Sequence, residues 1–174
     1  TDFATFKLMV YDPRSAQNKQ VLEHPFEDGV TTSLSVTVPV TIAGKQGYQG
    51  IRAVYSTLNG SDFRDIPDLI LPGGDQSIGT IDGYWFGAYS FQQYLVQDDE
   101  DPSRGWGVFG QVAVSDGNPN PFGWSAFLGL GGSSLLPERP DDTFGIAYFY
   151  YGFSEELKDG LETLNYELSD ESGI

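Results

Sequence analysis

Four polar side chains stand within otherwise apolar segments, and their types suit hydrogen bonding to a solute: Lys7, Arg52, Gln92 and Gln111. Ammonium, guanidinium and carboxamide groups all donate hydrogen bonds to hydroxyl oxygens. In a water-filled channel such donors would be solvated and could bind the hydroxyls of a passing solute. On the surface of a soluble protein the same residues would simply be solvated.

Residues that catalysis requires are scarce or badly placed. The 174 residues include no cysteine and one histidine, His24, which stands in a predicted loop. No Gly-x-Ser-x-Gly elbow occurs, and paired carboxylates such as those at 98–101 fall in predicted turns, where solvation explains them. We therefore expect no enzyme, no catalytic residue, no cofactor and no metal centre; a glycosidase is the alternative that the carboxylates leave open.

Two short motifs imitate known binding sites but lack their key residues. Residues 116–120 begin like a calcium loop, yet Pro121 and Phe127 occupy the positions that glycine and glutamate should hold. Residues 129–132 (GLGG) lack the spacing of a phosphate loop. Only adventitious binding of divalent cations by the acidic loops is left.

The charge balance excludes one large class of partners. Asp and Glu number 25 against 9 Lys and Arg, for a net charge of −16. A chain this acidic repels phosphate backbones, so we expect no nucleic-acid partner. With 39% hydrophobic and 14% aromatic residues, the chain is nevertheless too apolar for a disordered acidic tail.

The strongest pattern is an alternation of apolar and polar residues. Between residues 33 and 42, leucine, valine and isoleucine alternate with serine, threonine and Pro39. Such a segment forms a strand with one apolar and one polar face, and proline is tolerated near an edge or a bulge. The same reasoning predicts about seven strands, over residues 3–11, 33–43, 47–57, 84–96, 104–115, 123–132 and 143–153.

Turn-forming residues separate these strands and indicate hairpins. We expect short turns at residues 44–47 and 116–122, and long connections at 12–32 and 58–83. Turns on one rim and loops on the other fit a barrel, although a soluble Greek-key sandwich also mixes connection lengths. After the last strand, a helical turn is expected at 154–160, capped by its first residue, a serine, and ended by its last, a glycine.

Alternation alone does not tell which face meets solvent. A soluble β protein buries its apolar face, whereas a membrane barrel turns that face to lipid. No run approaches the roughly 18 apolar residues of a spanning helix, so membrane residence would require a barrel. Trp85, Trp106 and Trp124 near strand starts, with Tyr11 and Tyr48 at strand ends, fit an interfacial girdle and equally fit rings that cap a sandwich core.

Several motifs follow one another in a distinctive order: residues 104–110 (RGWGVFG), 115–121 (SDGNPNP), 129–132 (GLGG) and 137–145 (PERPDDTFG). Residues 10–13 (VYDP) and 26–30 (FEDGV) extend the likeness upstream, more loosely. In these motifs the sequence resembles the carbohydrate-selective porins of the OprB family.

The resemblance implies an all-β fold, an antiparallel transmembrane barrel of 16 strands in a Gram-negative outer membrane. Residues 1–174 would be a single segment of it, with about seven strands and incomplete at both ends. Neutral sugars would diffuse passively through the barrel past Lys7, Arg52, Gln92 and Gln111, with lipid around it and no cofactor. A monomer or a homotrimer is compatible with the sequence, and two other functions stay open: a soluble β-sandwich carbohydrate-binding module and a structural outer-membrane barrel.

Overall fold

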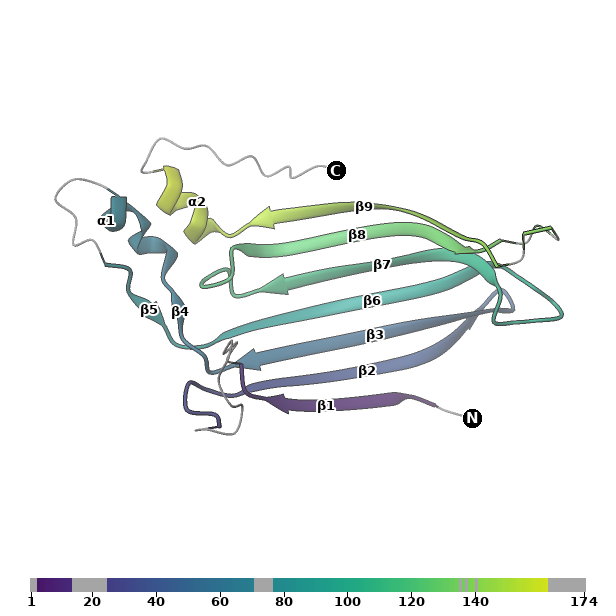
Figure 1. The fold of residues 1–174 in the computed structure, drawn as a ribbon, viewed down its shortest axis with the longest axis horizontal. Coiled ribbons are helices and arrows are strands. Elements are labelled where there is room, and N and C mark those ends of the chain that lie inside the picture. The colour runs from purple at the N-terminus through teal and green to yellow at the C-terminus, as the bar shows by residue number, and fades with distance from the viewer. Residues whose placement is uncertain are drawn as a thin grey trace.

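One antiparallel sheet accounts for most of the described chain (Figure 1). The computed structural model describes residues 3–13, 25–70, 77–134, 136, 138–139 and 141–162. The sheet has seven strands: β1 (Thr5–Tyr11), β2 (Thr31–Ile42), β3 (Lys45–Ser56), β6 (Tyr84–Gln97), β7 (Gly105–Ser115), β8 (Phe122–Ser133) and β9 (Thr143–Phe153). All seven predicted strands are confirmed, with ends shifted by up to two residues, and each pairs with its neighbours along the chain.

Two local features of β2 show how its sequence fits the sheet. Pro39 pairs with Tyr48 of β3 but lies beyond the last β1–β2 pair, Thr5 with Thr37, so on that side no strand needs its missing N–H. The β2–β3 turn consists of Ala43 and Gly44, both with positive φ (50° and 75°), as a two-residue hairpin requires. The predicted turn at 44–47 was therefore placed too late, since alanine gives no signal for positive φ.

Connections of different length gather at the two ends of the sheet. One end, the turn rim, carries the β2–β3, β6–β7 and β8–β9 connections; the other, the loop rim, carries the long connections 12–30 and 57–83. Strand direction places the short turn 116–121 at the loop rim too, so loops and turns are not fully separated. Both rims are visible at opposite ends of Figure 1.

The register divides the side chains of all seven strands into two faces. Phe6, Val36, Ile51, Tyr89 and Val112 face one another across successive strand pairs and belong to the apolar face. The adjacent row belongs to the polar face and contains Lys7, Ser35, Arg52, Ala88 and Ala113. The predicted alternation therefore extends coherently across the sheet.

Burial on the sheet is the reverse of that in a soluble protein. Large apolar residues are strongly exposed, among them Phe6 at 69%, Ile51 at 65% and Ile146 at 74%. The buried non-glycine strand residues all lie on the polar face: Thr31, Ser33, Val54 and Ser56. Because side chains crowd on the concave side of a curved sheet, the polar face is the concave one.

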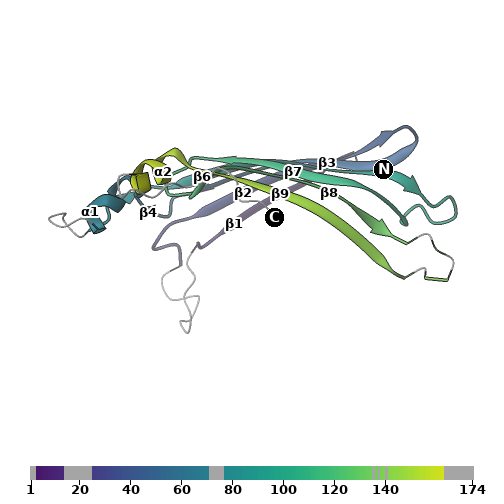
Figure 2. The ribbon, with the colours of Figure 1, turned by 90° about the horizontal axis from the view of Figure 1, so that it is seen from above.

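Curvature completes the architecture. Figure 2 shows the edge strands β1 and β9 on the same side of the middle strands, so the sheet forms an arc. An arc with a polar concave face and an apolar convex face is a segment of a transmembrane β-barrel wall. A sandwich would instead bury the apolar face under a second sheet.

The tryptophans and tyrosines divide between the two faces. Trp85, Trp106 and Trp124 fall on the apolar face by register, with Trp106 near the turn rim and the other two near the loop rim. That is the arrangement of interfacial girdles. Tyr11 and Tyr48 lie on the polar face instead, so their predicted place in an outer girdle was wrong.

Small elements within the long connection 57–83 pack together at the loop rim. They are β4 (Gly60–Ser61), η1 (Phe63–Asp65), α1 (Ile66–Ile70) and β5 (Thr80–Ile81) (Figure 1). β4 pairs with β5, whereas η1 and α1 contact α2 (Glu155–Glu162), which follows β9. Among the described residues, no helix is long and apolar enough to span a bilayer.

A buried carboxylate joins this connection to the β7–β8 turn. Asp62 accepts hydrogen bonds from Asn118 Nδ2 (2.8 Å) and from the backbone N–H of Arg64 (3.0 Å), and pairs with Arg64 Nη2 (2.6 Å). Asn118 Oδ1 accepts in turn from the N–H of Phe63 (3.1 Å). Asn118, in the motif that imitates a calcium loop, therefore serves to bind two connections together.

Helix α2 confirms one end of the predicted helical turn and corrects the other. Ser154 Oγ accepts from the N–H of Leu157 (3.3 Å) and caps the helix as predicted. Gly160 does not end the helix but lies within it, buried against η1. A Cβ there would stand 2.5 Å from the carbonyl oxygen of Phe63, so close packing explains the glycine.

The face assignment predicts unequal effects of one charge on the two faces. We expect Ile51→Lys to lower the free energy of unfolding of the full barrel by about 2–4 kcal/mol, because it sets an ammonium against lipid. Thr37→Lys, on the polar face of the neighbouring strand, should cost far less. Urea unfolding in lipid vesicles measures both; equal losses would contradict the assignment.

The loop-rim contacts predict a pH dependence. The Arg64 hydrogen bond, with help from Asn118, holds the pKa of Asp62 well below its ordinary 3.8. Because the folded pKa is depressed, the stabilisation is present above pH 3.8 and is lost only as the pH falls towards the folded value. In Arg64→Leu the pKa should rise, so the connection should open at a less acidic pH.

Hydrogen exchange of residues 62–65, followed from neutral pH to well below pH 3.8, measures this opening. Arg139→Leu is the matched control, because it breaks an equally short ion pair, Arg139–Asp142 (2.6 Å), in the β8–β9 connection at the opposite rim. Identical pH profiles for Arg64→Leu and wild type would show that Arg64 does not hold the connection in place.

Candidate functional site

All four polar residues singled out in the sequence lie on the concave face. Lys7 and Arg52 stand in one row, separated by Ser35 of β2. Gln111 stands one row nearer the turn rim, opposite Ser90, and Gln92 one row further, opposite Tyr48. Adjacent strands are about 4.8 Å apart, so Lys7 and Arg52 are separated by roughly 10 Å at the backbone.

The Arg52 guanidinium is hydrogen-bonded through its Nε, while its two Nη groups bond to none of the described residues. Its Nε donates to Ser33 Oγ (3.1 Å), and its guanidinium lies 5.7 Å from the centre of the Phe86 ring. Among the described residues, no acceptor is bonded to its two Nη groups. These donors therefore face the concave space, where they can bind hydroxyl oxygens.

Acidic residues are excluded from the strands. None of the seven strands of the large sheet contains Asp or Glu, whereas they contain Lys7, Lys45 and Arg52. All 25 acidic residues of the sequence lie outside these seven strands. The net charge of −16 therefore does not come from the sheet, and the charged side chains on its concave face are cations.

A groove of about 290 Å³ crosses the concave face between β2 and β8. Its lining combines polar and aromatic side chains, including Thr37, Tyr48, Ser90, Gln92, Phe109 and Phe127. Gly50 lies at its floor, where a Cβ would stand 3.1 Å from Ser90 Oγ. The volume is at the lower end for small-molecule sites.

Sequence reasoning found one residue of this groove, Gln92, and missed its aromatic members. Even spacing along a strand could have found Tyr48, four residues before Arg52, and Phe109, two before Gln111, since residues i and i+2 share a face. Phe127 could not be found this way, because it reaches the groove only through the β7–β8 register, where it pairs with Gln111.

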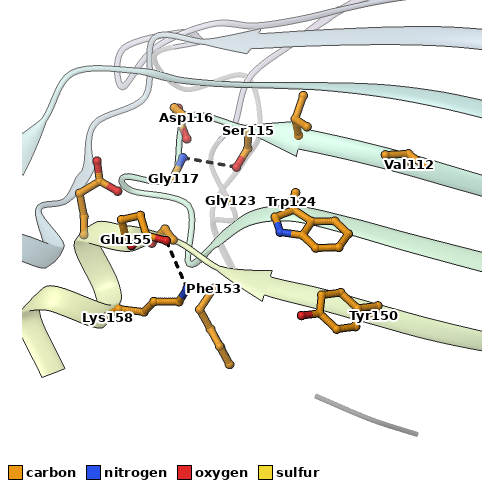
Figure 3. Close-up of a pocket in the computed structure, with 13 residues that line it drawn as sticks. Val112, Ser115, Asp116, Gly117, Gly123, Trp124, Tyr150, Phe153, Glu155 and Lys158 are labelled. Atoms are coloured by element: carbon orange, nitrogen blue, oxygen red, sulfur yellow. Dashed lines mark hydrogen bonds and ion pairs between the residues drawn. The ribbon is translucent and has the colours of Figure 1, made fainter. Parts of the chain in front are cut away.

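A larger pocket of about 790 Å³ lies on the other face, near the loop rim (Figure 3). Its wall includes Trp124 and Tyr150, whose rings stack at 4.7 Å, and Lys158, which pairs with Glu155 at 3.2 Å. Figure 3 shows these side chains around the junction of β9 and α2. None of the four polar residues lines it, so it is separate from the concave face.

Two acidic residues that could suggest a catalytic or metal site instead accept hydrogen bonds from backbone N–H groups. Asp98 accepts from the N–H groups of Asp101 (3.0 Å) and Glu100 (2.9 Å), which lowers its pKa. Asp116 accepts from the N–H of Trp85 (2.7 Å). In the part of the chain that the structure describes, no three His, Cys, Asp or Glu residues are grouped to hold a metal ion. His24 lies outside the described residues.

Comparison with known proteins agrees with this architecture. The family model "Carbohydrate-selective porin, OprB family" matches residues 18–169. A high-pH structure of OprB from Pseudomonas putida is similar, with a TM-score of 0.72 and 20% sequence identity, over 95% of this chain and 40% of that one. At this identity the structural likeness speaks for the fold alone. Among curated proteins, none matches the sequence.

The structural likeness and the family match point the same way. The chain spans 40% of the similar structure's chain, in keeping with a sheet that arcs without closing. The family model covers residues 18–169 of the 174, far more than half. The chain therefore belongs to the OprB family of carbohydrate-selective porins.

Proposed function

We propose that residues 1–174 form one segment of the wall of an outer-membrane channel, and that neutral sugars diffuse through that channel passively. The observation that carries the proposal is the inverted sheet: an apolar convex face against lipid and a polar concave face with open donors. Family membership supports a channel instead of an enzyme, sugars as solutes, and the Gram-negative outer membrane as the location.

Hydrogen bonding on the concave face supports sugars as the solute. Lys7, Arg52, Gln92 and Gln111 can replace part of the hydration shell of a sugar without a deep pocket. Open, shallow sites bind weakly enough for release, as conduction requires. Since the seven strands contain no carboxylate, neither Lys7 nor Arg52 forms an ion pair with a strand residue of this sheet, and Arg52 uses only its Nε on Ser33.

The two alternative functions differ from a porin in ways that can be measured. A soluble carbohydrate-binding module would have to bury the convex face, on which Phe6, Ile51 and Ile146 are mostly exposed. A structural barrel would share the fold and conduct no sugar. The exposed convex face favours the two barrel functions, and the open donors of Arg52 favour the porin.

The first test is single-channel recording of the full-length protein in a planar bilayer, with neutral monosaccharides and disaccharides added. We expect stepwise channels that sugar blocks in a concentration-dependent way, together with sugar uptake in liposome swelling. A folded barrel with neither sugar block nor sugar uptake would support the structural function and refute transport.

Arg52→Ala tests the proposed contact residue. We expect the half-blocking sugar concentration to rise by roughly three- to tenfold, the usual effect of losing one or two hydrogen bonds in a wet site. Barrel assembly should be unchanged, because Arg52 is exposed and gives the sheet one side-chain bond, to Ser33.

Lys45→Ala is the matched control for Arg52→Ala. It removes a cation from the same strand, but at the turn rim and in the opposite register position. Sugar block in this variant should equal that of wild type. If sugar blocks the Arg52→Ala channel at the same concentration as the wild-type channel, Arg52 is not a sugar contact.

A further inference from the structure

The concave face is chemically divided along the sheet. Its β1–β3 part carries hydroxyl, ammonium and guanidinium groups, as in Lys7, Ser35 and Arg52. Its β7–β9 part carries phenylalanine and glycine: Phe109, Phe127, Phe149 and, between them, Gly129. Gln92 belongs to β6, between these two parts, whereas Gln111 belongs to β7 and pairs with Phe127.

The phenylalanines form a continuous aromatic surface. The ring centres of Phe109 and Phe127 are 6.2 Å apart, and those of Phe127 and Phe149 are 5.3 Å apart. Phe109 lies over Gly129, where an added Cβ would stand 2.5 Å from the ring. The glycine thus lets the ring lie against the wall, and we call the three rings, Phe109, Phe127 and Phe149, the phenylalanine platform.

The phenylalanine platform lines one hollow of the concave face and lies next to a second. Phe109 and Phe127 line the 290 Å³ groove together with Gln92. A second hollow of about 260 Å³ continues towards the loop rim and is lined by Gln111, Ser125 and Phe122. Gln111 pairs with both Ser90 and Phe127 of the first groove, so the two hollows adjoin.

A glutamine beside aromatic rings matches a solute that is polar at its edge and apolar on its face. A pyranose ring is such a solute: its hydroxyls point outwards and its axial C–H groups form a flat apolar face. An aromatic face carries partial negative charge, which attracts C–H groups, and stacking also removes apolar area from water. An acyclic polyol with as many hydroxyls has no such face.

We infer that the phenylalanine platform is a stacking surface for cyclic sugars, which pass along the wall from one hollow to the next while Gln92 and Gln111 bind their hydroxyls. The inference rests on the proposed function and adds a basis for selectivity to it. The channel then prefers a pyranose to a hexitol of nearly equal size. Hydrogen-bond donors alone would not produce that preference.

The test compares current block by glucose and by sorbitol in the full-length channel. Phe127→Leu keeps an apolar side chain but removes the ring, whereas Phe127→Tyr keeps the ring. We expect Phe127→Leu to raise the half-blocking glucose concentration by about three- to tenfold and to leave sorbitol block nearly unchanged. Phe127→Tyr should keep the preference for glucose. Phe149→Leu, at a ring that is 40% exposed, provides a second variant should Phe127→Leu fail to assemble.

Phe144→Leu is the matched control, since Phe144 lies on β9 with Phe149 but on the convex face. Glucose should block the Phe144→Leu channel at the same concentration as the wild-type channel. A wild-type channel that sorbitol blocks as well as glucose does, or a Phe127→Leu variant that keeps the glucose preference, would overturn the stacking surface while leaving sugar transport in place. Ion conductance with no sugar block or uptake would refute the proposed function itself.

Accessibility of the platform is tested independently. The 174 residues contain no cysteine, so Phe149→Cys introduces a unique thiol into this segment. A water-soluble, membrane-impermeant maleimide should label it in the assembled channel, and glucose should slow the labelling. A folded variant that resists labelling would show that another part of the protein covers the platform, and the inference would fail.

Discussion

The whole structure depends on a fixed register between neighbouring strands. Because successive side chains alternate between faces, a slip of one residue would turn the apolar set into the channel and the polar set into lipid. Lipid offers no hydrogen bonds to an unpaired backbone group, so the pairing must also be continuous. The two register shifts, at Tyr94/Val96 and Phe122/Trp124, lie near strand ends, where water can reach the backbone.

Crowding on the concave face sets the second constraint. Small residues recur there, such as Gly50, Ala88, Ala113 and Gly129, and the ring of Phe109 lies over Gly129. The concave face therefore combines shallow hollows with aromatic rings, without needing an enclosed pocket. On the convex face volume is unconstrained, and leucine, isoleucine and phenylalanine stand outwards at high exposure.

The sequence was sufficient for the strands and for which side chains of one strand share a face, because a period of two is a local property of the chain. It did not tell which face turns to solvent, and it misplaced Tyr11 and Tyr48. It was insufficient wherever a residue's role depends on a partner far away in sequence. Gly160 looked like a helix stop but lies against Phe63, almost a hundred residues earlier. Likewise, Phe127 reaches the groove only through its pairing partners. The elements within 57–83 were missed because they are short and depend on distant partners: η1 and α1 pack on α2, and β4 pairs with β5.

The acidic and basic residues are distributed unevenly in this segment, which the net charge alone does not reveal. A carboxylate on the convex face would be costly in lipid, and one beside Arg52 would pair with the guanidinium, whose Nη groups we propose as solute contacts. Placing every acidic residue outside the strands avoids both costs. The acidic rims and the cationic wall then act in opposite senses on any ion that passes. In the proposed channel a neutral solute experiences neither field strongly, so hydrogen bonds and ring contacts with the concave face would govern its passage.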